Sequence, residues 1–374
     1  MVVRPLTKEL QAKAAVELKE DPKRIEEDLK YLREWLSQQK HIRARTDDQW
    51  LITFLRGCKF SLEKTKEKLD MYYTMRTLVP EFFKDRDPFS PRIQEVLKTG
   101  ILLPARVPIS ADSPKVTLIR NGIYDPLKIT NQDIFKTNLM ILDILLMEDD
   151  QFVVCGMTGL QDMAGITMTH MTSSPLSIVK KGFTCFQDAY PIRPKDMHLY
   201  NIPSFFETMY ALIKPFLNEK MQKRLVVHPS AKLEEMYKFI PKHVLPSEYG
   251  GDAGPIQDLI DYWKEKVESY SEWFKEDEKK YGTDEALRPG KPKTTNELFG
   301  IEGSFRKLNR CGWYNAQAYV PHHSFVCQKI DDLLAERPSD STEGDFFNTP
   351  SFFETVIDMV KPFMNKKMPR RVNS

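Results

Sequence analysis

Two pairs of basic residues are spaced so that each pair projects from one side of the chain. Arg193 and Lys195 flank Pro194 at positions i and i+2, so in an extended conformation both side chains lie on the same face. Lys220 and Arg224 are four residues apart, which places them on one side of a helical turn. Four such cations could bind a polyanionic headgroup, and arginine can bind a phosphate bidentately. The alternative is that they are ordinary solvated surface charges.

Sequence motifs for catalysis and nucleotide binding are missing. There is no Gly-x-Ser-x-Gly elbow, no Gly-x-x-x-x-Gly-Lys-Ser/Thr loop and no Gly-x-Gly-x-x-Gly turn. The cysteines are odd in number and form no Cys-x-x-Cys pair, at Cys58, Cys155, Cys185, Cys311 and Cys327. This pattern favours a reducing compartment over a disulfide framework or a zinc site. We therefore expect no catalytic residues, no cofactor and no metal.

The overall charge is nearly balanced, which makes any anion site local. Lys+Arg 55 against Asp+Glu 53 gives a formal charge of +2, unlike a chain that wraps nucleic acid. The longest apolar stretch, 139–147, contains Asp143 and is too short to span a bilayer. We expect a cytoplasmic protein with no secretion signal and no transmembrane helix.

The elements before residue 80 are expected to be helical. One apolar stripe with helical spacing is formed by Ile25, Leu29, Leu32 and Leu36. Thr46 and Gln49 have the spacing of a capping box for the next helix, and a third helix is expected from Ser61. Residues 1–79 are therefore predicted to form a helical subdomain.

Residues 80–254 are expected to form an α/β domain. Strands are predicted at 116–120, 151–155, 197–201 and 225–228, with helices at 130–147, 177–186 and 204–221. This alternation is typical of βαβ units and predicts a mixed or parallel sheet. A final amphipathic helix with Leu259, Trp263 and Val267, then an exposed segment at 288–295, belong to a C-terminal extension over 255–310.

The helix predicted at 204–221 has an unusually broad apolar face. Its apolar residues are Phe205, Phe206, Met209, Tyr210, Leu212, Ile213, Phe216 and Leu217. Pro215 removes one helical hydrogen bond and should kink the helix. The helix is either an ordinary core helix or the mobile wall of a lipid cavity.

The C-terminal residues contain a partial copy of this helix. Residues 201–224 and 348–371 match at most positions, whereas 311–347 does not resemble the sequence before residue 201. We interpret 311–374 as an atypical tail joined to an otherwise complete protein.

Four segments resemble the CRAL-TRIO (Sec14-like) lipid-binding family, in particular its insect branch similar to α-tocopherol-transfer and retinaldehyde-binding proteins. They are DQWLITFLRGCKF at 48–60, QDAYPIRPKDMH at 187–198, IKPFLNEK at 213–220 and LPSEYGG at 245–251. The segments keep the family's order and spacing, and the resemblance covers about residues 20 to 310.

The resemblance implies a helical N-terminal subdomain and a lipid-binding domain whose cavity is closed by a gate helix, here the one near Ser204. It implies that Arg193, Lys195, Lys220 and Arg224 bind phosphoinositide phosphates. A further basic position of the branch falls on Cys58, with Arg56 and Lys59 beside it, so that contribution is uncertain. Positions similar to the family's cavity lining are Phe183, Cys185, Phe186, Ile192, Phe206, Met209, Tyr210 and Ile213.

The expected function is that of a soluble intracellular carrier, not an enzyme. We expect it to bind a tocopherol-, retinoid- or phospholipid-like molecule and to exchange it at phosphoinositide membranes, as a monomer that associates with them peripherally. No nucleic-acid partner is expected. The alternative is a lipid-sensing adaptor that regulates membrane trafficking through a protein partner.

Overall fold

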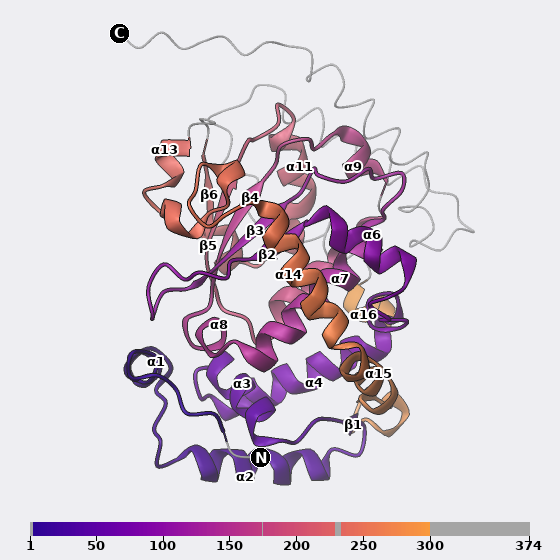
Figure 1. The fold of residues 1–374 in the computed structure, drawn as a ribbon. Helices are drawn as coiled ribbons and strands as arrows, with labels where there is room; N and C mark the ends of the chain where they lie inside the picture. Colours follow the sequence, from indigo (N-terminus) through magenta and orange to yellow (C-terminus); the bar gives the residue numbers. More distant parts are fainter. Residues whose placement is uncertain (1–2, 174, 229–232, 300–374) are drawn as a thin grey trace, which may run out of the picture.

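The computed structural model describes residues 3–173, 175–228 and 233–299 (Figure 1). The first part of the chain is helical, as predicted, and α1 to α4 lie in the lower part of Figure 1. These helices are α1 (Lys8–Lys13), α2 (Ile25–Gln38), α3 (Asp48–Gly57), α4 (Leu62–Leu78), α5 (Pro80–Phe83) and α6 (Pro91–Thr99). The stripe of α2 is confirmed, because Leu29, Leu32 and Leu36 are buried. The tail predicted at 311–374, with its copy of 201–224, lies outside the described residues.

The capping box predicted at Thr46 is wrong. Asp47 is the N-cap of α3, and its carboxylate accepts a hydrogen bond of 2.9 Å from the Trp50 amide. With the cap at Asp47, Gln49 is no longer at the third helical position, and its side chain instead accepts a hydrogen bond from the Arg4 amide of the N-terminal segment at 2.9 Å. A long-range contact therefore overrides the local motif.

Five strands form a mixed sheet, which confirms the predicted fold class. They are β2 (Leu102–Pro104), β3 (Lys115–Arg120), β4 (Met157–Asp162), β5 (Pro194–Tyr200) and β6 (Leu225–Val227), side by side in that order. β2 pairs with β3 antiparallel, and the other pairs are parallel. The parallel strands are connected by α7 (Asn131–Glu148), α9 (Met168–Thr172), α10 (Leu176–Thr184) and α11 (Phe206–Ile213), among other helices. A separate antiparallel pair joins β1 (Ile42–Arg43) to β7 (Gly282–Thr283).

The strand predicted at 151–155 is also wrong, because these residues form helix α8 (Asp150–Cys155). The Asp149 side chain caps this helix by accepting a 2.8 Å hydrogen bond from the Phe152 amide, and Gly156 ends it with a φ of 81°. A short apolar run does not distinguish a buried helix from a buried strand. The strand follows instead as β4.

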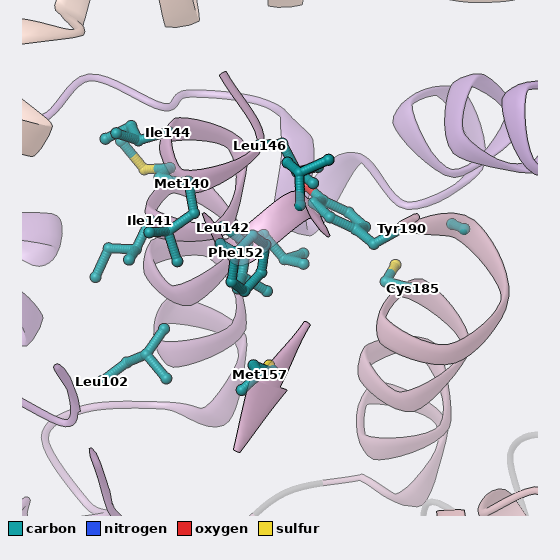
Figure 2. Close-up of a cluster of buried hydrophobic side chains, with 14 of the residues drawn as sticks. Leu102, Met140, Ile141, Leu142, Ile144, Leu146, Phe152, Met157, Cys185 and Tyr190 are labelled. Atoms are coloured by element: carbon teal, nitrogen blue, oxygen red, sulfur yellow. The ribbon is translucent and has the colours of Figure 1, made fainter. Parts of the chain in front are cut away.

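The two sides of β5 show how the sheet divides the core. Met197 and Leu199 pack among side chains of α11 and α12 (Glu219–Gln222), whereas Tyr200 packs into the main core. Such alternation is expected of a strand covered on both faces. Figure 2 shows part of the main core, where side chains of α7 meet Met157, Cys185 and Tyr190.

A buried charge network ties the helical part to the rest of the chain. Arg76 on α4 and Arg86 contact both Asp143 on α7 and Asp277 on α15 (Ser271–Lys280), and all four side chains are at most 3% exposed. Arg86 Nη1 lies 2.9 Å from Asp143 Oδ2, and Arg76 Nε lies 2.9 Å from Asp277 Oδ2. The network joins residues of the three predicted regions 1–79, 80–254 and 255–310 and so does not divide them. The boundaries at 79/80 and 254/255 stay predictions.

Helix α13 (Leu233–Met236) follows β6. The C-terminal helices α14 (Ile256–Ser269), α15 and α16 (Thr295–Phe299) then pack back against earlier elements of the chain. Trp263 on α14 donates its indole hydrogen to the Pro104 carbonyl at 2.7 Å, which fixes α14 to β2. Arg288, predicted in an exposed segment, instead binds both carboxylate oxygens of Asp70 on α4 at 2.8 Å. Within the described ranges, no helix combines the length and apolarity needed to cross a membrane.

Candidate functional site

All four cations of the predicted basic site line one cleft of about 600 Å³. Arg193 and Lys195 come from the loop before β5 and from its start, whereas Lys220 lies on α12 and Arg224 just after it. The Met197 amide donates a hydrogen bond of 2.9 Å to the Arg224 carbonyl, and this contact holds the two basic pairs next to each other. The structure thus brings together residues that are up to 31 positions apart.

The opposite wall of the cleft contributes three more cations, of which Lys59 was left uncertain and Lys64 and Lys68 were missed from the sequence. Lys59 follows α3, and Lys64 and Lys68 lie on α4 four residues apart. The same i, i+4 spacing that marked Lys220 and Arg224 was present here, but lysine pairs are common on exposed helix faces. Only the three-dimensional structure shows that the face of α4 with Lys64 and Lys68 lines the same cleft as the four predicted cations.

The backbone at the base of the cleft is tightly constrained. A Cβ atom at Gly57 would lie 2.3 Å from the carbonyl oxygen of Pro191, so only glycine allows the two walls to approach this closely. Lys59 and Phe60 follow with φ angles of 54° and 55°, in the left-handed region that non-glycine residues seldom occupy. Such strain is concentrated at functional sites and here aims Lys59 into the cleft.

The positive charge of the cleft is not matched by its own acidic residues. Seven lysine and arginine side chains line it, against two carboxylates, Glu67 and Asp188. Within the described residues, the side chains of Lys59, Lys64, Lys220 and Arg224 form no ion pair or hydrogen bond. Burial and then the neighbouring charges, first that of Arg224, lower the pKa of Lys220. An anion bound here would relieve that repulsion.

Two of the predicted cations already have partners. The Arg193 guanidinium is 10% exposed and donates to the carbonyls of Val153 and Val154 in α8. Lys195 Nζ lies 2.8 Å from Glu17 Oε2 of the N-terminal segment. Arg193 therefore has a structural role in holding α8, and an external anion that approaches Lys195 meets the carboxylate of Glu17.

The position occupied by a basic residue in the resembling branch is neutral here. Cys58 lines the cleft, and burial raises the pKa of its thiol, so it carries no charge. Arg56 does not replace it, because this buried side chain binds Glu20 with two hydrogen bonds of 2.9 and 3.0 Å. Of the candidates around Cys58, only Lys59 lines the cleft.

The predicted cavity residues lie in neighbouring apolar clusters. Phe206 and Met209 of α11 pack with Met163 and Leu199, whereas Phe183 and Phe186 pack with Met197, Leu217 and Met221. Tyr210 contacts both clusters and is half-buried, as are Ile192 and Ile213. Cys185 is different, because it is fully buried in the main core beside Tyr190 (Figure 2).

The broad apolar helix is broken rather than kinked at Pro215. α11 ends at Ile213, a 3₁₀ turn covers Lys214–Phe216, and α12 begins at Glu219. Gln187 bridges the break: its side chain donates to the Phe216 carbonyl and accepts from the Asn218 amide, each at 2.8 Å. Gln187 also lines the cleft, so the cleft contacts the connection between α11 and α12.

Comparisons with known proteins match both walls of the cleft. A family model described as "CRAL/TRIO domain" matches residues 111–251, and one described as "Pinta-like, UBA domain" matches residues 21–93. The Homo sapiens protein "Alpha-tocopherol transfer protein-like" is 31% identical over 254 residues, 67% of this chain and 72% of that protein. The Mus musculus protein of the same description has the same identity and coverage.

Two further comparisons are more distant. "Clavesin-2" from Homo sapiens is 28% identical over 287 residues, 73% of this chain and 86% of that protein. The solved structure "Crystal structure of Sfh5" is 16% identical, covers 82% of this chain and 100% of that chain, and has a TM-score of 0.41, too low to support an argument. On the family match and the 31% identical relatives, this chain belongs to the CRAL/TRIO, or Sec14-like, family of lipid-binding proteins.

Proposed function

We propose that the chain is a carrier that binds one small hydrophobic lipid and exchanges it at membranes containing phosphoinositides. The observation that carries this proposal is the cleft with seven cations and two carboxylates, which is continuous with the apolar clusters of α10 to α12. A cleft with this excess of positive charge suits phosphate groups, whose oxygens accept several charge-assisted hydrogen bonds.

The apolar side chains near α11 support a lipid site. Phe183, Phe186, Tyr210 and Ile213 are only half-buried, although aromatic and aliphatic side chains of this size are usually buried more completely. A lipid seated against them would remove this remaining apolar surface from water. The similarity to alpha-tocopherol transfer protein-like proteins favours a tocopherol-, retinoid- or phospholipid-like molecule over a water-soluble one.

The link between the two sites is helix α12. Lys220 faces the cleft, and the next residue, Met221, lines the cleft and also packs with Leu217 in the apolar cluster. An anion that draws Lys220 and Arg224 towards it would therefore move Met221 against the wall of the lipid site. We infer that headgroup binding and opening of α11 are coupled through this helix.

Attraction to membranes should be local, because the net charge of the whole chain is only +2. Each lysine or arginine near an anionic bilayer contributes about 1 kcal/mol to binding. We propose that the chain is a cytoplasmic monomer that reaches membranes peripherally through this cleft, and that it carries lipid without breaking a bond.

The test is the double variant Lys220→Ala, Arg224→Ala, which spares the structural Arg193. Binding to phosphatidylcholine vesicles that contain phosphatidylinositol bisphosphate should weaken by about 2 kcal/mol, or roughly thirtyfold. Transfer of retinol, a fluorescent tocopherol and pyrene-labelled phosphatidylcholine between such vesicles is then compared for the purified wild type and the variant. Uptake of the transferred probe should persist in the variant, while its delivery slows.

The matched control is Lys275→Ala, Lys280→Ala, which removes two exposed lysines of α15 that do not line the cleft. It should bind vesicles like the wild type. Equal loss in both double variants would refute the cleft as the membrane site. Failure of the purified wild type to transfer any probe would refute the carrier and favour an adaptor.

A further inference from the structure

Glu17 places a negative charge on the basic cleft from outside its lining. Its carboxylate lies 2.8 Å from Lys195 Nζ, 3.4 Å from Lys13 Nζ and 3.8 Å from Arg193 Nη1. Glu17 belongs to a single π-helical turn, Ala14–Leu18, that follows α1. The N-terminal segment therefore supplies an anion to the two cleft cations that already have partners.

We propose that Glu17 is an internal competitor for phosphate, whose carboxylate holds Lys195 until a phosphomonoester group replaces it. This inference rests on the proposed function, because it assigns a regulator to the same cleft. It makes Glu17 a residue that sets the affinity of the site without itself binding the ligand.

The ion pair is weak enough to be displaced. The side chains of Glu17 and Lys195 are 32% and 31% exposed, and pairs of this kind contribute at most about 1 kcal/mol in water. A phosphomonoester carries nearly two charges and three acceptor oxygens, whereas the carboxylate carries one charge. Burial alone would raise the pKa of Glu17, but Lys195 and then Lys13 lower it, so the competitor is charged at neutral pH.

Displacement requires only a side-chain movement, because the segment on each side of Glu17 is anchored. Ala14 and Leu18 are fully buried against Val154 and Cys155. Glu20 is held by its two hydrogen bonds to the buried Arg56. Glu17 can therefore rotate away from Lys195 while the backbone of the segment stays in place.

The charges around Glu17 define what replaces it. Lys59, Lys64, Lys220 and Arg224 form no ion pair within the described part of the chain, so a first phosphate can bind them without displacing a carboxylate. A second phosphate that reaches Lys195 comes close to the Glu17 carboxylate, and the repulsion between the two anions favours rotation of Glu17 away from the cleft. Competition should therefore be felt by ligands with several phosphate groups.

The test measures the affinity of Glu17→Gln for vesicles with phosphatidylinositol bisphosphate and for soluble inositol trisphosphate. Removing an exposed ion pair of this size should raise affinity about threefold to fivefold for both ligands. A gain with vesicles alone would refute competition for phosphate, because it would then depend on the bilayer surface. The matched control is Glu9→Gln, the same charge change at an exposed position of α1 that does not line the cleft.

A double-mutant cycle separates competition from long-range charge effects. In a Lys195→Met background, Glu17→Gln should give a clearly smaller gain, since the nearer of the two cleft cations that Glu17 contacts is gone and only Arg193 remains, at 3.8 Å. An undiminished gain there, or an equal gain in Glu9→Gln, would overturn the inference. If the wild type binds vesicles and Glu17→Gln binds them with the same affinity, this inference alone is refuted. If neither protein binds vesicles, the proposed function is refuted as well.

Discussion

The two clusters of basic side chains in this molecule differ in whether their charges are matched. In the buried network, Arg76 and Arg86 form ion pairs with Asp143 and Asp277, and all four side chains are almost fully buried. In the cleft, seven cations face two carboxylates, and water reaches the site. The same residue types thus serve structure in one region and remain available to a ligand in the other.

The pKa values move in opposite directions in the two regions. Burial would lower the pKa of Arg86, but the charges of Asp277 and Asp143 outweigh it and raise the pKa. At Lys220, burial and the neighbouring cations act together and lower the pKa. Inside the fold each charge is stabilised by a partner, whereas in the cleft the cations destabilise one another until an anion arrives.

The largest expected effect is in the buried network. Asp143→Ala should lower the free energy of unfolding by about 3 to 5 kcal/mol, because it leaves two buried arginines short of a partner. Urea denaturation followed by circular dichroism measures this. The control Asp261→Ala, at an exposed position of α14, should change the stability by less than about 0.5 kcal/mol. Similar stability of the two variants would contradict the comparison.

Salt should separate the two regions next. Raising the salt from 0.1 M to 1 M shortens the screening length from about 10 Å to about 3 Å, which weakens interactions at the exposed cleft but hardly reaches buried pairs. We expect affinity for phosphatidylinositol bisphosphate vesicles to fall more than about tenfold. The free energy of unfolding in urea should change by less than about 1 kcal/mol over the same range. Vesicle affinity that does not change with salt concentration would show that the cleft cations do not provide the attraction to the membrane.

Asp70 provides an intermediate case that acid can test. Burial would raise its pKa, but hydrogen bonds and charges of Arg288 and Lys293 lower it from 3.8 to about 2. Because the pKa of Asp70 is lower in the folded than in the unfolded state, its ionised carboxylate stabilises the fold at any pH above the unfolded pKa. This stabilisation is lost as the pH falls from about 4 through about 2. After allowance for solvent screening, we expect a loss of about 1 to 2 kcal/mol. Denaturant titrations at several pH values measure it, and Arg288→Met should flatten the profile.

The smallest expected effect has the opposite sign. After allowance for solvent screening of this exposed side chain, Lys220→Met should raise the free energy of unfolding by at most a few tenths of a kcal/mol, because a lysine whose pKa is lowered in the folded state opposes folding while it is charged. Thermal unfolding detects such a gain, and Lys279→Met on the exposed end of α15 is the matched control. Destabilisation by Lys220→Met beyond that of the control would show that Lys220 has a structural role.

Arg193, Lys195, Lys220 and Arg224 could be predicted as two same-face pairs from local spacing, but only the family resemblance predicted that they form one site. The apolar stripe of α2 and the alternation of strands and helices were also predictable from local patterns. Lys64 and Lys68 could not be assigned, because their role depends on which face of α4 packs against residues 185–189, and Lys59 was left uncertain. The helix at 150–155 was missed because its apolar run suits either state.

Side-chain partners were the least predictable feature. Asp143 interrupts an apolar stretch in the sequence, yet its charge is balanced by ion pairs with two arginines more than fifty residues away. Arg56 was uncertain for the same reason, since its partner Glu20 is recognisable only in the folded chain. Which charges are free and which are neutralised is a property of tertiary structure, and the function depends on that difference.

The close approach of Gly57 to Pro191 has an entropic consequence. The two walls of the cleft are joined at their base by a contact that leaves no room for a Cβ atom, so their spacing is set before any ligand arrives. Ordering loops or domains on binding consumes part of the interaction energy, and a preformed site avoids that loss. The base of the cleft, between Lys59 and Arg193, should therefore be preformed while α12 stays free to respond to a headgroup, and Gly57→Ala would change the spacing at that base.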